Sequence, residues 1–218
     1  MNYIDALFLA FIEGLTEFLP ISSTGHLILT SAFIGINEDS FVKAFNIIIQ
    51  FGAIASVLVL YWKRFLPDLN FYKKIFIAFL PAAVIGLVIK NKIDIILGSV
   101  IVVAIAFILG GFILIWTDTR FKNNSKNKKT IDNLDWKACL SIGLIQCFAF
   151  IPGTSRAGAT IVGGLFLGMD RKEATEFSFF LAVPTLAGAF LVKSLQVFKT
   201  VNSDQVEILV FGTVFSFI

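Results

Sequence analysis

The run EGLTEFLPISSTGH, at residues 13–26, places two carboxylates, a proline, consecutive hydroxyl residues and the only histidine of the chain inside an apolar stretch. Glu13 and Glu17 are four residues apart, so in a helix they lie one turn apart on the same face. Pro20 ends such a helix because it lacks an N–H group and disfavours helical geometry in the residue before it. Three residues of the type that caps a new helix follow: Ser22, Ser23 and Thr24. The run therefore predicts a helix, a break and a second helix.

Composition indicates that this break lies in a membrane protein. Of the 218 residues 57% are apolar and 15% charged, and the mean hydropathy is +0.87. One soluble core cannot bury so much apolar surface, and several stretches reach the roughly 20 residues that a spanning helix needs. The net charge of +3 is small and its basic residues gather in loops, which indicates membrane topology and headgroup contact and excludes a nucleic-acid partner. We expect an all-α, polytopic membrane protein in contact with lipid.

The apolar runs divide the first half of the chain. Residues 2–36 form two pieces, each too short to span, and predict a re-entrant helical pair. Full-length spans are predicted over 43–62, 71–89 and 93–117. Residues 119–135 are strongly polar and predict a loop.

The chain then resembles itself at a constant offset of 132 residues. The offset aligns two separate stretches, for example Pro20 with Pro152, Ser23 with Ser155 and Phe45 with Phe177. It indicates an internal structural repeat, with chance matching in so apolar a chain as the alternative. Because each copy would hold three spans, an odd number, the second copy would be inverted across the membrane. The two broken pairs would then enter from opposite faces and meet near the midplane.

The repeat predicts a first unit over residues 1–118 and a second over 136–218. The second unit would contain a re-entrant pair over 137–169, a span over 173–198 and a partial span over 206–218. The counterpart of the third span would fall at 225–249, beyond Ile218, so we expect the second copy to be incomplete, through truncation or through divergence of the copies at their ends.

Loop charge orients this topology. Residues 63–74 carry four basic residues and residues 120–137 carry six, and the span count puts both loops on one side. The short loop between them offers Lys90 and Lys92. The richer side is predicted to be cytoplasmic, which makes 119–135 a cytoplasmic loop and opens the first broken pair to the outer face.

A second polar break lies at residues 151–161, IPGTSRAGATI. Its proline and Gly153 interrupt a helix, and Thr154 and Ser155 supply hydroxyls and the next N-cap. Arg156 is costly in apolar surroundings, which points to a clamp for a phosphate or carboxylate, with a structural partner for a buried carboxylate as the alternative. Two half-helix N-termini at one cavity would form an anion site.

The carboxylate pair of the first break would repel an anion unless a cation lay between them. Glu13 and Glu17 can hold a hard divalent metal, Mg²⁺ or Ca²⁺, together with phosphate oxygens. A proton- or ion-coupling site is the alternative. His26 follows Ser23 by three residues, on the same face of the new half-helix, and is placed as a general base or acid for a hydroxyl. A buried structural histidine is the alternative for it.

The two breaks, with EFSFFLAVPT at residues 176–185, resemble the signature stretches of the bacitracin-resistance type undecaprenyl-diphosphatase family. The resemblance covers the chain from Asn2 onward. It implies a metal-dependent enzyme of the bacterial plasma membrane that hydrolyses undecaprenyl diphosphate to undecaprenyl phosphate and inorganic phosphate at the outer face, recycling the cell-wall lipid carrier. The family commonly has Ser where this chain has Ala157, and it has further C-terminal helices beyond the position of Ile218.

Carried over by motif, the functional positions are Glu13, Glu17, Ser23, His26, Ser155, Arg156 and Thr160. We expect catalytic roles for Glu17, Ser23, His26 and Arg156, and metal binding by Glu13 and Glu17. Phosphate would be bound by Ser22, Thr24, Gly153, Thr154, Ser155 and Thr160. Ser23 is the preferred nucleophile, with His26 or Glu17 taking its proton. Direct attack by water and phosphorylation of His26 stay open.

Inverted repeats with broken helices and midplane carboxylates are also typical of secondary transporters, which are the alternative to an enzyme. A lipid-binding scaffold without turnover is a third reading. The sequence leaves the oligomeric state open, with a homodimer as one alternative.

Overall fold

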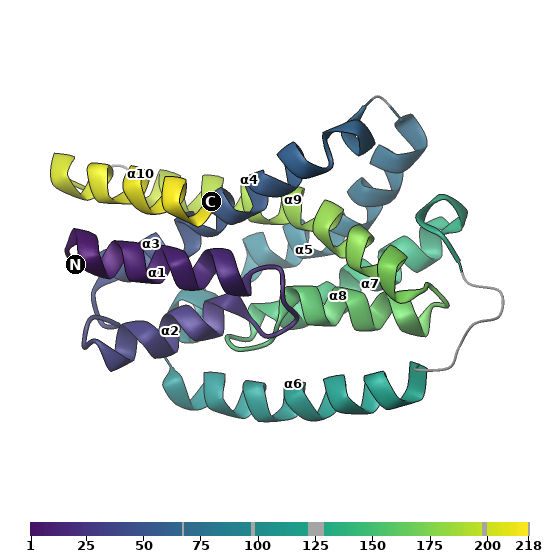
Figure 1. Cartoon of the computed structure of the whole chain (residues 1–218), viewed down its shortest axis with the longest axis horizontal. Helices are drawn as coiled ribbons and strands as arrows, with labels where there is room; N and C mark the ends of the chain where they lie inside the picture. Colours follow the sequence, from purple (N-terminus) through teal and green to yellow (C-terminus); the bar gives the residue numbers. More distant parts are fainter. Residues whose placement is uncertain (67, 97–98, 122–128, 198–199, 218) are drawn as a thin grey trace.

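The computed structural model describes residues 1–66, 68–96, 99–121, 129–197 and 200–217, with the backbone alone over 90–96. All the named elements of this part are helices, as predicted (Figure 1). The α-helices are α1 Tyr3–Thr16, α2 Ser23–Phe33, α3 Ser40–Ile48, α4 Gln50–Leu60, α5 Leu69–Ile96, α6 Val100–Phe121, α7 Trp136–Gln146, α8 Arg156–Phe166, α9 Arg171–Val197 and α10 Ser203–Phe217. Three short 3₁₀ helices are η1 Trp62–Phe65, η2 Ile131–Asn133 and η3 Cys147–Phe150.

The first hairpin, α1 and α2, is built by local hydrogen bonds around the predicted break. The Asn2 side chain caps α1, and the N–H of Glu17 donates to the Glu13 carbonyl at 2.9 Å, which closes its last turn. Ser22 caps α2 by accepting the N–H of Gly25 at 3.3 Å. Ser22 also has a φ of 65°, a left-handed conformation that is costly for a residue with a side chain. The break therefore lies over residues 17–22, around Pro20.

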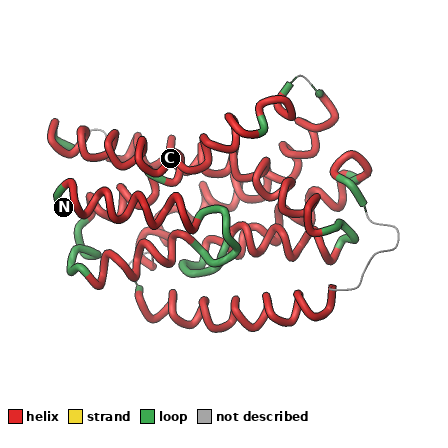
Figure 2. The backbone as a smooth tube through the Cα atoms, viewed as in Figure 1, coloured by secondary structure: helices red, strands yellow, loops and turns green. Residues whose placement is uncertain are grey.

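The second hairpin, α7 and α8, has the same plan with a longer break. The Asp135 side chain caps α7, η3 follows it, and Ser155 caps α8 by accepting the N–H of Gly158 at 2.9 Å. Figure 1 shows α1 and α2 toward the left end and α7 and α8 toward the right, while the loops of both breaks lie near the middle in Figure 2. The first turn of α8 lies against the first break, because a β-carbon on Gly158 would lie 3.3 Å from the Pro20 carbonyl oxygen.

Four segments of the described residues are long and apolar enough to cross a membrane: Ser40–Leu60, Leu69–Ile89, Val100–Phe121 and Arg171–Val197. The length and hydropathy of these helices are those of an integral membrane protein. The first of these segments is interrupted at Ile49, between α3 and α4. The last has a proline, Pro184, inside the single helix α9.

Several helix boundaries differ from the prediction: α6 runs on to Phe121, past the predicted start of the polar loop at 119, and the boundary near residue 93 lies elsewhere. The helix predicted over 71–89 runs on through the polar residues 90–92 to Ile96, and the next helix begins at Val100 instead of at residue 93. The boundary falls there because the Ser99 hydroxyl accepts the N–H of Val102 at 3.3 Å and so caps α6. The middle of the predicted polar loop, residues 122–128, lies outside the described residues.

Two apolar clusters hold the hairpins against the longer helices. Phe180 of α9 makes edge-to-face contacts with the aromatic rings of Tyr61, Phe65 and Phe71 at centroid distances of 5.3–5.5 Å. The other cluster packs Leu9 of α1 and Phe45 of α3 against Ile208 of α10. By contrast, α6 lies along one side of the bundle in Figure 1 and exposes most of its apolar side chains.

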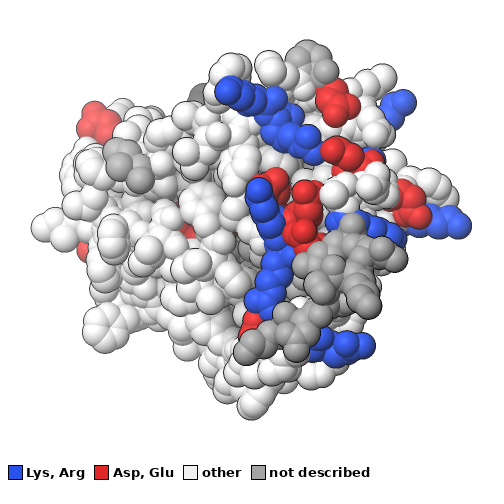
Figure 3. Space-filling model, turned by 45° about the vertical axis from the view of Figure 1, so that its right-hand side comes forward, with Lys and Arg blue, Asp and Glu red and all other residues white. Residues whose placement is uncertain are grey.

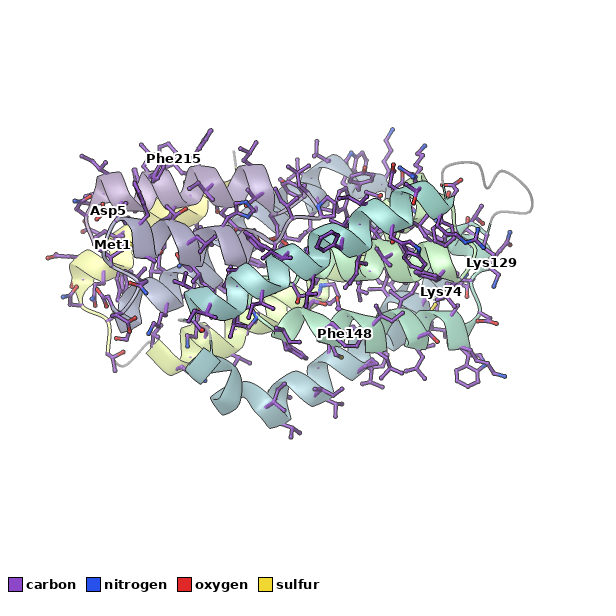
Figure 4. All side chains as sticks on the ribbon, turned by 90° about the horizontal axis from the view of Figure 1, so that it is seen from below. Met1, Asp5, Lys74, Lys129, Phe148 and Phe215 are labelled. Carbon is purple, nitrogen blue, oxygen red and sulfur yellow. The ribbon has the colours of Figure 1, made fainter. Side chains whose placement is uncertain are left out.

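Charged residues gather at one end of the molecule, as Figure 3 shows. Arg64 pairs with Asp132 at 3.0 Å, and the Nζ of Lys74 donates to the Ile131 carbonyl at 2.9 Å. In Figure 4, Lys74 and Lys129 lie at the end opposite Met1 and Asp5. These contacts confirm that the two basic loops lie at the same end, and their assignment to the cytoplasm stays a prediction.

Candidate active site

The tips of both hairpins line one cavity of 360 Å³, whose other walls come from α3, α4, α5 and α9. The first hairpin contributes Glu17, Ser22, Ser23 and Thr24, and the second contributes Thr154, Ser155, Arg156 and Ala157. Small and apolar side chains form much of the remaining wall, among them Ala82, Gly86 and Leu87 of α5 and Gly188, Ala189 and Val192 of α9. The structure thus brings the two sequence motifs to one place, with a polar floor and an apolar wall.

A buried ion pair joins the hairpins at the floor of this cavity. The Nη2 of Arg156 donates to the Oε1 of Glu17, and the side chains are only 11% and 6% exposed. The hydroxyl of Ser23 donates to the other Glu17 oxygen, Oε2. A buried charge is costly without a partner, so Glu17 of the first hairpin and Arg156 of the second each allow the other to be buried.

Further contacts fix the Arg156 guanidinium and leave one of its donors free. Its Nη1 donates to the Ser178 carbonyl of α9 at 3.1 Å, while its buried Nε has no hydrogen-bond partner among the described residues. The hydroxyls of Thr160 and Ser178 lie 2.7 Å apart. Thr160 does not line the cavity, and its hydroxyl instead contacts Ser178, the residue to which Arg156 donates. The Nε–H is therefore an unpaired, buried donor of a residue that lines the cavity.

The N-termini of α2 and α8 add backbone donors, since the first N–H groups of a helix have no partner inside it. Ser22 and Ser155 cap these helices and line the cavity. Thr24 accepts the Nε2–H of Gln50 at 3.0 Å. Gly153 packs elsewhere: its φ is +91°, and a β-carbon there would lie 2.8 Å from the backbone of Val103 in α6. Its part is to turn the chain into α8.

Glu13 is fully buried one helical turn below Glu17 and does not line the cavity. Neither of its carboxylate oxygens has a hydrogen-bond partner in the described part of the chain, although Glu17, Ser23 and Arg156 are near enough to act on its charge. The described residues contain no cluster of three or more His, Cys, Asp or Glu side chains. Glu13 and Glu17 are therefore the carboxylate donors available here, and the unpaired oxygens of Glu13 suit a hard cation.

His26 is not brought to the cavity wall. Its Nδ1 lies 2.9 Å from the Ser22 carbonyl oxygen, and its ring lies 5.0 Å from the ring of Phe107 in α6. The imidazole thus faces α6 on the outer side of α2, whereas Ser23 faces Glu17. Of the four residues expected to be catalytic, three meet and His26 lies apart.

A family model described as bacitracin resistance protein BacA matches residues 6–218, almost the whole chain. The chain belongs to this family. It is 55% identical over 218 residues to an undecaprenyl-diphosphatase of Bdellovibrio bacteriovorus, covering 100% of this chain and 83% of that protein. Similar proteins of the same name occur in Flavobacterium psychrophilum, 49% identical over 221 residues (100% and 83% covered), and in Porphyromonas gingivalis, 41% identical over 241 residues (100% and 84% covered).

In this BacA family chain the cavity also holds polar residues that the sequence reasoning overlooked. They are Gln50, Gln146, Thr185, Lys193 and Gln196, with Ser178 behind Arg156. A signal for them exists, because a polar side chain in the middle of an apolar span is expensive and points to function. It was weak for Gln50 and Gln146, which stand singly among apolar residues outside the two breaks, whereas Ser178 and Thr185 lie in the 176–185 stretch that carries the family resemblance.

Proposed function

We propose that this chain is an undecaprenyl-diphosphatase that hydrolyses undecaprenyl diphosphate to undecaprenyl phosphate and inorganic phosphate, and so recycles the lipid carrier of cell-wall synthesis. The observation that carries the proposal is the meeting of Ser23, Glu17 and Arg156 at one cavity, between two helix N-termini. A hydroxyl, a proton acceptor and fixed positive donors are the groups that phosphoryl transfer requires. The names of the relatives support the same activity.

The topology that fits this activity is an inverted repeat with two re-entrant hairpins. In its support, an offset of 132 residues relates α2 to α8, the α3–α4 pair to α9, and α5 to α10. α9 begins at Arg171, at the basic end, so the cavity residues Lys193 and Gln196 lie toward the opposite end. If the basic end is cytoplasmic, as the positive-inside rule predicts, the site opens to the outer face of the plasma membrane.

The shape of the cavity matches a lipid diphosphate. A volume of 360 Å³ is near the lower end of the range for pockets that hold a drug-sized ligand, so it accommodates the headgroup and the first isoprene units. The remaining chain would lie in the bilayer. The free Nε–H of Arg156 and the N–H groups of α2 and α8 would bind the phosphate oxygens at the polar floor.

The chemistry proceeds in two steps in this proposal. The Ser23 oxygen attacks the terminal phosphorus, its proton passes to Glu17, and the bridging oxygen leaves with the lipid monophosphate. Water then attacks the phosphorus of the phosphoserine, the bond to the Ser23 oxygen breaks, Glu17 returns the proton to that oxygen, and inorganic phosphate is released. Arg156 and the helix N–H groups stabilise the charge that develops on the phosphoryl oxygens. Direct attack by water and phosphorylation of His26 are the competing routes, and isolation of a phosphorylated Ser23 peptide distinguishes them.

Glu13 and Glu17 would hold the divalent metal, Mg²⁺ or Ca²⁺, together with the bound phosphate. When bound, the metal offsets the negative charge of the diphosphate and lets two buried carboxylates lie beside an anion. The unpaired buried oxygens of Glu13 support this assignment.

The deciding experiment gives the purified chain a polyprenyl diphosphate in detergent and measures inorganic phosphate. We expect release that depends on Mg²⁺ or Ca²⁺, stops with a chelator and is lost in Glu17→Gln. The rival reading, a secondary transporter, predicts solute flux in proteoliposomes without phosphate release. A lipid-binding scaffold predicts neither, and either of these two results would overturn the proposed function.

A further inference from the structure

Gln146, the last residue of α7, carries a hydrogen-bond donor that nothing in the described structure uses. The residue is 2% exposed and lines the cavity together with Thr154, Ser155 and Arg156. Its Oε1 lies 3.3 Å from the Thr185 hydroxyl, whose nearer acceptor is the Leu181 carbonyl at 2.8 Å, and its Nε2 has no partner among the described residues. Burying an amide N–H without a partner is unfavourable, so such groups in cavities commonly await a ligand or water.

The other amides of the cavity differ from Gln146. Gln50 already donates its Nε2–H groups to the Thr24 hydroxyl and to the Asn46 carbonyl, each at 3.0 Å. Gln196 is exposed at the far end of the cavity wall. Gln146 therefore combines burial, a position on the cavity wall and an unused donor.

The helix α9 shows how far Gln146 lies from the ion pair. Ser178 contacts Arg156, and Thr185, which contacts Gln146, follows seven residues later, about 10 Å along a helix axis. Lys193 and Gln196 lie further along the same wall. Gln146 thus lies between the polar floor and the part of the cavity that leads away from it.

A lipid diphosphate bound for hydrolysis must place its terminal phosphate at Ser23 and Arg156 and its chain along the apolar wall. The phosphate esterified to the lipid then lies between them, at the level of Gln146. An amide N–H donates only, so it selects an acceptor such as a phosphate oxygen and rejects a cation. It would also stabilise the charge that gathers on this phosphate as the bridging bond breaks.

We propose that Gln146 is a substrate-binding residue whose Nε2–H donates to the ester-linked phosphate of the lipid diphosphate, with Thr185 holding the amide in place. This inference rests on the proposed phosphatase function. It divides the cavity into two phosphate subsites: Arg156 with the helix N-termini for the terminal phosphate, and Gln146 for the phosphate that leaves with the lipid.

The test measures binding to the purified full chain in detergent with two probes. One is a short-chain polyprenyl methylenediphosphonate, which carries both phosphorus groups and cannot be hydrolysed at the bridge, and the other is inorganic phosphate. We expect Gln146→Met to weaken diphosphonate binding about tenfold or more, the effect of losing one hydrogen bond to a charged group, and to leave phosphate binding unchanged. Gln146→Glu should weaken the diphosphonate further, because a carboxylate would face an anion.

Gln196→Met is the matched control, since it removes an exposed amide from the same wall, and it should change neither affinity. Melting temperatures establish that each variant folds. The inference is overturned if Gln146→Met weakens both probes equally, which would indicate a structural role, or weakens neither, which would indicate an amide bound to water alone. Failure of the wild type to release phosphate while still binding the diphosphonate would refute the proposed function and leave the two-subsite result standing.

Discussion

The α1–α2 hairpin brings carboxylates, Glu13 and Glu17, to the middle of the molecule, whereas the α7–α8 hairpin brings the guanidinium of Arg156 and the amide of Gln146. Both hairpins present a serine-capped helix N-terminus to the same cavity. The backbone of each hairpin thus supplies helix N–H donors to the cavity, while the charged side chains of the two hairpins have opposite signs. Neither hairpin is a complete site, since Glu17 and Arg156 each depend on the other hairpin for the partner of a buried charge.

The two breaks also differ in detail. The left-handed residue is the N-cap itself in the first hairpin, Ser22 with a φ of 65°, but in the second it is Gly153, two residues before the cap. Ser23 and Ser155 occupy equivalent positions in the sequence repeat, yet one hydroxyl donates to Glu17 and the other caps α8. Equivalence in sequence therefore does not carry a role from one hairpin to the other.

The largest expected effect separates these two serines. Ser23→Ala should lower kcat/KM for a polyprenyl diphosphate by about 10⁴-fold or more, as loss of a nucleophile does. It should also cost about 1.5–3 kcal/mol of the free energy of unfolding, because buried Glu17 loses a donor. Ser155→Ala should cost about 1 kcal/mol of the free energy of unfolding through the lost cap and reduce kcat/KM far less. Phosphate-release kinetics and denaturant unfolding measure both. Comparable activity losses in the two variants would contradict the asymmetry.

The next effect tests the charge pairing between the hairpins. Arg156→Ala should lower kcat/KM by about 10³-fold, because the charge on the transferring phosphoryl group loses its cation. It should also lower the free energy of unfolding by about 3–5 kcal/mol, because Glu17 is left buried without a partner. In the double variant Glu17→Gln/Arg156→Ala much of the stability should return, but not the activity. Additive losses of stability would show that the two residues are not coupled.

The smallest effect concerns the backbone of the second break. Gly153→Ala should lower the free energy of unfolding by about 2 kcal/mol, since the residue has a φ of +91° and a β-carbon would meet the backbone of Val103 at 2.8 Å. Gly110→Ala is the matched control: this glycine is helical, and a β-carbon there meets nothing within 4 Å. It should stabilise the protein by up to about 1 kcal/mol. Melting curves in detergent compare the two, and equal signs would refute the role given to Gly153.

The sequence by itself determined the features that depend on neighbouring residues. Pro20 and the serine cap at Ser22 act within a few residues, so the break between α1 and α2 could be predicted where it occurs. Hydropathy located the spans, and counting them placed the basic loops at one end. The boundary near residue 93 was predicted wrongly because the end of a helix depends on a single capping residue, here Ser99. The neighbouring residues could equally have been helical.

Only the tertiary structure decided which distant groups meet. The helix break at Ile49 is not marked by a proline or glycine at that position. The Ile49 carbonyl accepts a hydrogen bond from the hydroxyl of Ser216, 167 residues away. The sequence likewise left Arg156 open between a phosphate clamp and a partner for a carboxylate, and packing of the two hairpins joined it to Glu17 across 139 residues. The same packing left His26 facing α6 and gave Gln146 its place on the cavity wall. The physical reason is that local hydrogen bonds follow from adjacent residues, whereas the approach of two helix pairs depends on the shape of every helix between them.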